Sequence, residues 1–179
     1  VRNRRSRRSA GIPIPVSRTS NRTTLDCLDS SNDLHFSLIE ISPFSEKLRA
    51  ILGFKQLAWR SVRVPIVMPK PDVVALTGGY RRTPILQIGA DVYCDTELAA
   101  RVIEARAPRP TLFPGDAPLA PFVAQWADAV LFWNAAIWAS QPAGAAVLFD
   151  NDATAMKAFG VDRAALTQGF RRPTFADAS

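Results

Sequence analysis

Three short polar motifs are the residues best suited to chemistry in this chain. They are Ser42-Pro43, Thr83-Pro84 and Asp95-Thr96. A serine before proline, or an aspartate before an amphipathic run, is a typical helix N-cap, and the N-terminus of a helix also favours bound anions. Taken singly, each motif is more often just a cap or a turn than a functional site, so only the combination can indicate a function.

Residue types that are scarce exclude several kinds of catalysis. The two cysteines, Cys27 and Cys94, form no CxxC motif and are too few for a disulfide framework or a zinc site. The one histidine, His35, would have to serve any Ser–His or Cys–His pair. We expect it instead to be a strand residue at a sheet edge, and we expect no metal site. With no secretory segment visible, a cytoplasmic protein is expected.

The net charge of +6 is concentrated at the N-terminus. Residues 1–22 hold seven arginines and no acid, which leaves 15 basic and 16 acidic residues in the rest of the chain. Such a run can bind nucleic acid or an anionic membrane, or form a transit peptide. However, the first 35 residues contain no aromatic ring for base stacking, and Pro13 and Pro15 interrupt any long amphipathic helix. We interpret residues 1–31 as a disordered basic extension and expect neither a specific nucleic acid nor a membrane as a partner.

The elements that must position the three motifs follow an α/β pattern. Strands are expected over residues 34–41 and 58–67, with a hairpin over 84–93 that turns at Gly89-Ala90. Helices are expected after Ser42, over 71–77, and after Asp95. In the first helix Phe44, Leu48, Ile51 and Leu52 share a face, and in the last we expect Leu98, Val102 and Ala105 to face inward. The order β-α-β-α-β-β-α predicts a thioredoxin-like domain over residues 32–106.

A proline-rich stretch then introduces a helical region. Residues 107–117 have linker composition, and apolar residues at steps of three and four predict a long amphipathic helix from about Pro118. Its most apolar part, residues 127–139, is expected to be a buried helix. Further helices are expected over 152–159 and 161–167, broken at Gly160. We interpret residues 118–179 as a partial, all-α C-terminal domain.

The motifs SPFSEKLR, TPIL and CDTELAARVIE, in this order and spacing, resemble those of cytosolic glutathione S-transferases. The resemblance covers about residues 35–115. It implies that Ser42 lies beside the sulfur of glutathione, that Thr83 and a cis Pro84 bind its cysteinyl backbone, and that Asp95 and Thr96 hold its γ-glutamyl group. Asp-Thr replaces the commoner Glu-Ser pair of the family but keeps its hydrogen-bonding capacity.

The resemblance also implies a reaction. A free thiol with a pKa of about 8.5 is only slightly ionised at neutral pH. The hydroxyl of Ser42 and the positive end of the helix dipole would favour the nucleophilic thiolate, which would attack a hydrophobic electrophile. Ser45 is the alternative activator, and no tyrosine lies near the first strand to take that role. The implied protein is a detoxifying glutathione transferase with glutathione as co-substrate, and the homodimer is the assembly that the resemblance suggests.

A second hypothesis is a glutathione-binding protein without turnover. Only 64 residues follow Gly115, whereas the helical domain of the family is usually the larger one. Trp126, Phe132, Trp133 and Trp138 would either line an electrophile pocket or pack in a helical core. The basic residue that would bind the glycine carboxylate is not specified by the motifs, with Lys70 and Arg82 as candidates.

Overall fold

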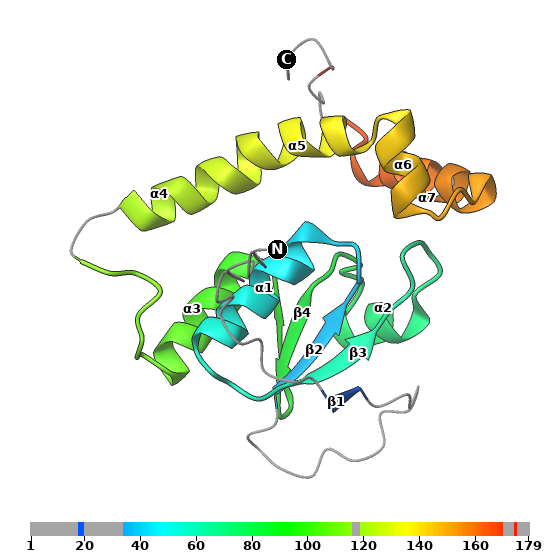
Figure 1. The fold of residues 1–179 in the computed structure, drawn as a ribbon. Helices are drawn as coiled ribbons and strands as arrows, with labels where there is room; N and C mark the ends of the chain where they lie inside the picture. The colour runs from blue at the N-terminus through cyan, green and yellow to red at the C-terminus, as the bar shows by residue number, and fades with distance from the viewer. Residues whose placement is uncertain (1–17, 20–33, 116–118, 170–173, 175–179) are drawn as a thin grey trace, which may run out of the picture. The chain divides into compact units, whose positions relative to one another are not determined.

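The computed structural model describes residues 18–19, 34–115, 119–169 and 174 (Figure 1). The chain divides into two compact units, and each is described separately below. The first comprises Val1–Arg63 and Leu76–Pro110, and the second comprises Val64–Ala75 and Thr111–Ser179.

The first unit is built on a mixed five-stranded sheet in the order β1-β3-β2-β4-β5. The strands are β1 (Arg18–Thr19), β2 (Leu34–Leu38), β3 (Arg60–Arg63), β4 (Ile85–Ile88) and β5 (Asp91–Cys94). β3 is parallel to both β1 and β2, whereas β4 is antiparallel to β2 and β5. The thioredoxin-like fold class expected from the sequence is therefore confirmed.

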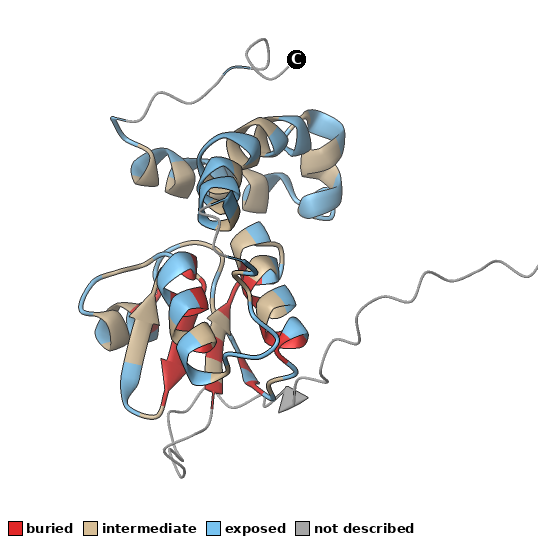
Figure 2. Ribbon diagram, turned by 90° about the vertical axis from the view of Figure 1, so that its left-hand side faces the viewer, coloured by how far each residue is buried: buried red, intermediate tan, exposed pale blue. Residues whose placement is uncertain are grey.

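Two helices lie side by side over the sheet (Figure 1). Helix α1 (Pro43–Phe54) begins after the N-cap Ser42, and α3 (Thr96–Arg106) begins after the N-cap Asp95. Helix α2 (Pro71–Thr77) has the bounds expected from the sequence and is followed by Gly78 and Gly79, both with positive φ. The buried residues line the sheet and the inner sides of α1 and α3 (Figure 2). The core consists of Leu34, Phe36, Leu38, Leu48, Leu52, Trp59, Leu86, Ile88, Ala99 and Ile103.

The strands are shorter than expected, for local reasons. β2 ends at Leu38 because the Ile39 N–H donates to the Ser45 hydroxyl, 3.4 Å away, rather than to a neighbouring strand. β3 ends at Arg63, two residues before Pro65, which has no N–H to contribute to a ladder. The sequence interpretation of His35 was wrong in one respect, since β2 is the central strand and not an edge.

The inward face of α3 was predicted only in part, since Val102 packs against the core but Leu98 and Ala105 are exposed. Leu98 is 46% exposed, and the buried residues of this helix are Thr96, Ala99, Ala100 and Ile103. Small alanines let the helix pack closely, and this stripe is less hydrophobic than the one chosen from the sequence. β1 was not predicted either. It falls within the extension assigned to residues 1–31, whose other residues lie outside the described part of the chain.

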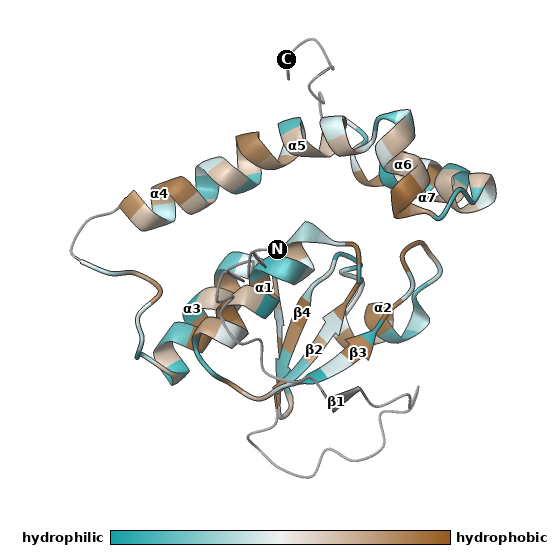
Figure 3. Ribbon diagram, viewed as in Figure 1, coloured by the Kyte–Doolittle hydropathy of each residue, from teal (hydrophilic) through white to brown (hydrophobic). Residues whose placement is uncertain are grey.

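The second unit is helical over its described C-terminal part. Helix α4 (Leu119–Trp126) continues through a π-helical turn, η1 (Ala127–Leu131), into α5 (Phe132–Ala139), followed by α6 (Pro142–Leu148) and α7 (Ala153–Leu166). Hydrophobic residues are frequent along α4 and α5 (Figure 3). No described residue of these helices is buried, so residues 127–139 form a helix but not a buried one. The few short helices of this unit do not enclose a core.

Gly160 does not interrupt α7, contrary to the sequence interpretation. A helical glycine costs only about 1 kcal/mol relative to alanine, which the flanking helix formers offset. The N-terminus of α7 is capped by Asp152, whose carboxylate accepts from the N–H groups of Thr154 and Ala155 at 2.8 and 3.0 Å.

Candidate functional site

The register of the sheet brings three chain segments together at one end of its strands. Ser37 of β2 lies opposite Ile85 of β4, and Ile85 lies opposite Cys94 of β5. The end of β2, the start of β4 and the end of β5 therefore lie at the same end of the sheet. The sequence motifs follow or precede these positions by a few residues.

All three predicted motifs therefore lie at that end of the sheet. Ser42 follows β2 after a short turn, Thr83-Pro84 leads directly into β4, and Asp95 directly follows β5. Ser42 and Thr83, 41 positions apart in the chain, thus lie at the ends of the adjacent strands β2 and β4. This juxtaposition depends on the register and not on the separate motifs.

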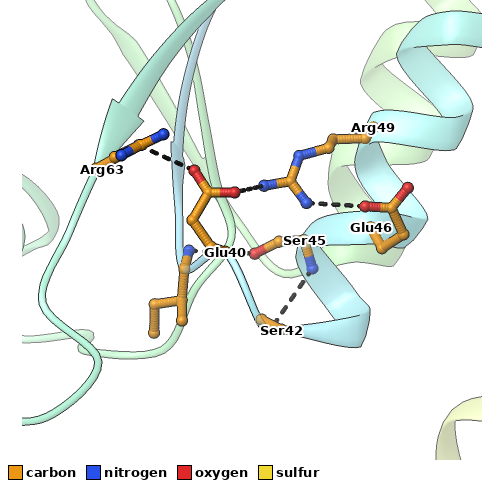
Figure 4. Close-up of polar contacts among 7 residues, drawn as sticks. Glu40, Ser42, Ser45, Glu46, Arg49 and Arg63 are labelled. Carbon is orange, nitrogen blue, oxygen red and sulfur yellow. Dashed lines mark hydrogen bonds and ion pairs between the residues drawn. The ribbon is translucent and has the colours of Figure 1, made fainter. Parts of the chain in front are cut away.

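The hydroxyl of Ser42 caps α1 and keeps a donor (Figure 4). Its oxygen accepts from the Ser45 N–H at 3.4 Å, and its own N–H donates to the Ile39 carbonyl at 3.1 Å. A serine hydroxyl has one hydrogen and two lone pairs, so capping the helix does not consume the O–H. Ser42 is half-buried, at the positive end of a 12-residue helix.

Ser45 is a poor alternative activator. Its side chain is completely buried and its oxygen accepts from the Ile39 N–H. The hydroxyl therefore closes the β2–α1 turn from inside and is not accessible to a ligand.

The Thr83–Pro84 peptide bond is cis. Thr83 is half-buried and Pro84 is buried, directly before the fully buried start of β4. The backbone of Thr83 thus lies just outside the last ladder pair between β4 and its neighbours.

Asp95 has a backbone conformation that residues other than glycine rarely adopt. Its φ of 84° is positive, and its carboxylate accepts from the Glu97 N–H at 2.8 Å. Positive φ in an aspartate costs free energy and is found preferentially at functional sites. Asp95 is exposed, whereas Thr96 exposes only 6% of its surface, so a ligand would reach a small part of Thr96 beside the first-turn N–H groups.

Tyr80 is a residue of this region that the sequence did not reveal. Burial raises the pKa of its hydroxyl, Arg82 acts in the opposite direction, and Asp95 and Cys94 raise it further. Burial also raises the pKa of the Cys94 thiol. Only the fold brings Tyr80 near Asp95, since 15 positions separate the two residues and no local pattern connects them.

The two basic residues considered for the glycine carboxylate differ in exposure. Lys70 exposes only 4% of its surface, whereas Arg82 is exposed. Lys70 belongs to the second unit and Arg82 to the first.

A group of four charged side chains surrounds the β2–α1 turn (Figure 4). Arg49 donates to Glu46 at 2.8 Å and to Glu40 at 3.0 Å, and Arg63 donates to the other oxygen of Glu40 at 3.0 Å. These two acids and two bases have a net charge of zero, so they add no net charge beside Ser42.

The described residues also bear on metal binding and on membranes. They contain no group of three or more metal-ligating side chains close enough to hold an ion. None of their helices combines the length and apolar character that crossing a bilayer requires.

Known proteins share sequence and fold with this chain. Residues 38–111 match the family model of the glutathione S-transferase N-terminal domain. A GST-like protein from Pseudomonas syringae is 50% identical, with a TM-score of 0.57 over 62% of this chain and 41% of that one. The chain therefore spans less than half of that relative. No curated protein matches the chain.

Two more distant structures share the fold. A glutathione S-transferase from Rhodospirillum rubrum F11 is 17% identical, with a TM-score of 0.52 over 75% of this chain and 64% of that one. A Tau class glutathione S-transferase from mango, Mangifera indica, is 14% identical, with a TM-score of 0.53 over 83% of this chain and 73% of that one.

The fold and the motifs at the strand ends thus define a thioredoxin-like domain followed by a helical unit. Residues 38–111 match the N-terminal domain of the glutathione S-transferase family, and this is the family that the first unit resembles.

Proposed function

We propose that this chain binds glutathione across the strand ends where the three motifs lie. The Ser42 hydroxyl activates its thiol for attack on a hydrophobic electrophile. The observation that carries the proposal is the register that aligns Ser37, Ile85 and Cys94 and so gathers the three motifs. Neighbouring strands lie about 4.8 Å apart, so β2 and β5 are separated by about 10 Å. An extended tripeptide is also about 10 Å long.

The proposed binding mode follows the order of the motifs. The sulfur lies at Ser42, the cysteinyl backbone pairs with Thr83 beside Pro84, and the γ-glutamyl group meets Asp95 and Thr96 at the start of α3. A helix N-terminus favours the γ-glutamyl carboxylate, and the exposed Asp95 carboxylate is a partner for its ammonium group.

Activation requires a modest free energy. Each unit by which the thiol pKa falls corresponds to about 1.4 kcal/mol of preferential thiolate stabilisation. A hydrogen bond to a charged group contributes about 1.5–3 kcal/mol, so one O–H from Ser42 suffices for one or two units. Ser42 has this hydrogen to donate because its oxygen, and not its O–H, caps α1.

A glutathione-binding protein without turnover is the second candidate. It is favoured by the absence of any buried residue in the described helices α4–α7. Phe132 and Trp133 contact each other edge to face at 5.1 Å, while Trp126 and Trp138 are about half exposed. These aromatic residues are the candidates for an electrophile site, and a homodimer is proposed from the family alone.

Calorimetric titration of the full chain tests binding. We expect glutathione and S-methylglutathione to bind, and the dipeptide Cys-Gly, which lacks the γ-glutamyl group, to bind much more weakly. Equal affinity for Cys-Gly would contradict the role of Asp95-Thr96, and no binding of any of the three would contradict the proposal. Turnover of a generic aromatic electrophile by the same preparation separates the transferase from the non-catalytic alternative.

A further inference from the structure

Arg49 joins two carboxylates that flank Ser42 in the sequence. One guanidinium nitrogen donates to Glu46, four residues after Ser42, and another donates to Glu40, two residues before it. The contacts measure 2.8 and 3.0 Å (Figure 4). A single side chain on the second turn of α1 thus spans the whole turn that leads from β2 into the helix.

The burial of Arg49 distinguishes it from an ordinary surface ion pair. Its side chain is 14% exposed, whereas those of Glu40 and Glu46 are 53% and 61% exposed. Exposed pairs contribute little, but a guanidinium withdrawn from water must keep its partners. Arg49 therefore depends on both carboxylates, and its contacts with them hold the three side chains together.

Glu40 is held from its other side as well. Its second oxygen accepts from Arg63 at the end of β3, so this carboxylate connects α1 to the sheet. Beneath it, the Ile39 N–H donates to Ser45 and the Ser42 N–H donates to the Ile39 carbonyl. The turn is thus fixed by backbone contacts on the inside and by Arg49 on the outside.

We propose that Arg49 is a positioning residue for Ser42: it fixes the β2–α1 turn so that the serine hydroxyl donates to the glutathione sulfur. This inference rests on the proposed function and extends it to a residue that does not touch the ligand. The planar fork of arginine can serve two carboxylates at once, whereas the compact ammonium of lysine cannot reproduce that geometry. Arg49→Lys therefore keeps the charge and removes the bridge.

The test compares Arg49→Lys with Arg101→Lys in the full chain. Arg101 of α3 pairs with Glu97 through two nitrogens, is 60% exposed and does not contact the β2–α1 turn, so it is a matched control. For each variant the thiolate absorbance of bound glutathione is titrated against pH, and the affinity for glutathione and the melting temperature are measured.

For Arg49→Lys we expect the midpoint of the thiolate titration to rise by about one pH unit, a tenfold change in the ionisation constant, with the affinity for glutathione within about twofold of wild type. Arg101→Lys should leave the titration unchanged. A lower melting temperature with a wild-type titration would show a purely structural role and overturn the inference. Should Arg49→Lys fail to fold, Glu40→Gln, a change at an exposed side chain, is expected to give the same shift, and a wild-type titration there would overturn it.

The wild-type titration separates the two claims. If wild-type bound glutathione titrates like the free tripeptide, both the proposed activation and this role for Arg49 are wrong. If the wild-type titration is displaced and that of Arg49→Lys is equally displaced, only the role of Arg49 is wrong.

Discussion

Ser42 serves two neighbours with different parts of one hydroxyl. The oxygen accepts from the Ser45 N–H at the start of α1, and the O–H remains for a ligand sulfur. The sequence predicted the cap from Ser42-Pro43 because capping is a local property. It could not show that Ser45 is buried or that Arg49 connects Glu40 with Glu46, since these depend on how the helix packs.

Thr96→Ala is expected to weaken glutathione binding by about 1–3 kcal/mol, the effect of leaving a buried polar partner unpaired. The fold should persist, because the Asp95 carboxylate still accepts from the Glu97 N–H. Calorimetry measures the affinity, and a melting curve is the control for folding. Unchanged affinity would place any ligand away from the N-terminus of α3.

Cys94 is expected to react slowly with iodoacetamide at neutral pH. Burial raises the pKa of its thiol, so the thiolate fraction is lower than in a free cysteine and rises only at higher pH. The measurement is the rate of alkylation against pH in a Cys27→Ser background, with the urea-unfolded chain as the control. The folded chain should give a midpoint above that of the unfolded chain, near 8.5 for a free thiol. A midpoint at or below that value would contradict the assigned environment.

At the scale of elements, a buried lysine joins the ends of α1 and α3. The completely buried side chain of Lys55 pairs with Glu104 and donates to the carbonyls of Ala107 and Pro110, both at 2.6 Å. Its three donors are thereby satisfied, and the segment after α3 is fixed to the end of α1. The residues in this contact are about 50 positions apart in the chain, so no local sequence pattern could predict it.

Lys55→Met is expected to lower the free energy of unfolding by about 2–4 kcal/mol, because the partly buried Glu104 carboxylate and two carbonyls lose their common partner. Urea denaturation measures the loss. Arg101→Met, which breaks an exposed pair in the same unit, is the control and should cost no more than about 1 kcal/mol. Similar losses in the two variants would mean that Lys55 contributes no more than a surface pair.

The presence of the helices and the hairpin could be predicted from the sequence. Which face of α3 is buried could not. Ser42, Asp95 and the Gly89-Ala90 turn indicated where elements begin and reverse, and the structure agrees. The inward face of α3 was misjudged because hydropathy favoured Leu98, while close packing on the sheet favours Ala99 and Ala100. Packing volume, and not hydrophobicity alone, decides between two neighbouring helical stripes.

At the scale of the molecule, the core of the first unit begins at Leu34 and ends at Ile103. These bounds are those of the core among the described residues. The boundary predicted at residues 31–32 rests on the sharp change of composition there, with apolar periodicity starting only at β2, and it stays a prediction. The sequence could not reveal that β1 pairs with β3, since two residues carry no periodic signal.

A chain beginning at Asn32 is therefore expected to fold and to bind glutathione like the full chain. It loses only the two-residue pairing of β1 with β3 among the described contacts of residues 1–31. Circular dichroism and calorimetric titration check this expectation. An unfolded product would mean that the N-terminal region belongs to the core.

The central claim, that Ser42 stabilises the thiolate of bound glutathione, is tested most directly by titrating the ultraviolet thiolate absorbance of that complex in wild type and in Ser42→Ala. Loss of the cap should by itself cost about 0.5–2 kcal/mol of stability, which a melting curve records separately. We expect bound glutathione in the wild type to ionise well below the free-thiol value of about 8.5, and in Ser42→Ala to return toward it with its affinity nearly intact. Identical titrations in the two proteins, with a lower melting temperature in the variant, would show that Ser42 is only a helix cap and would contradict the account.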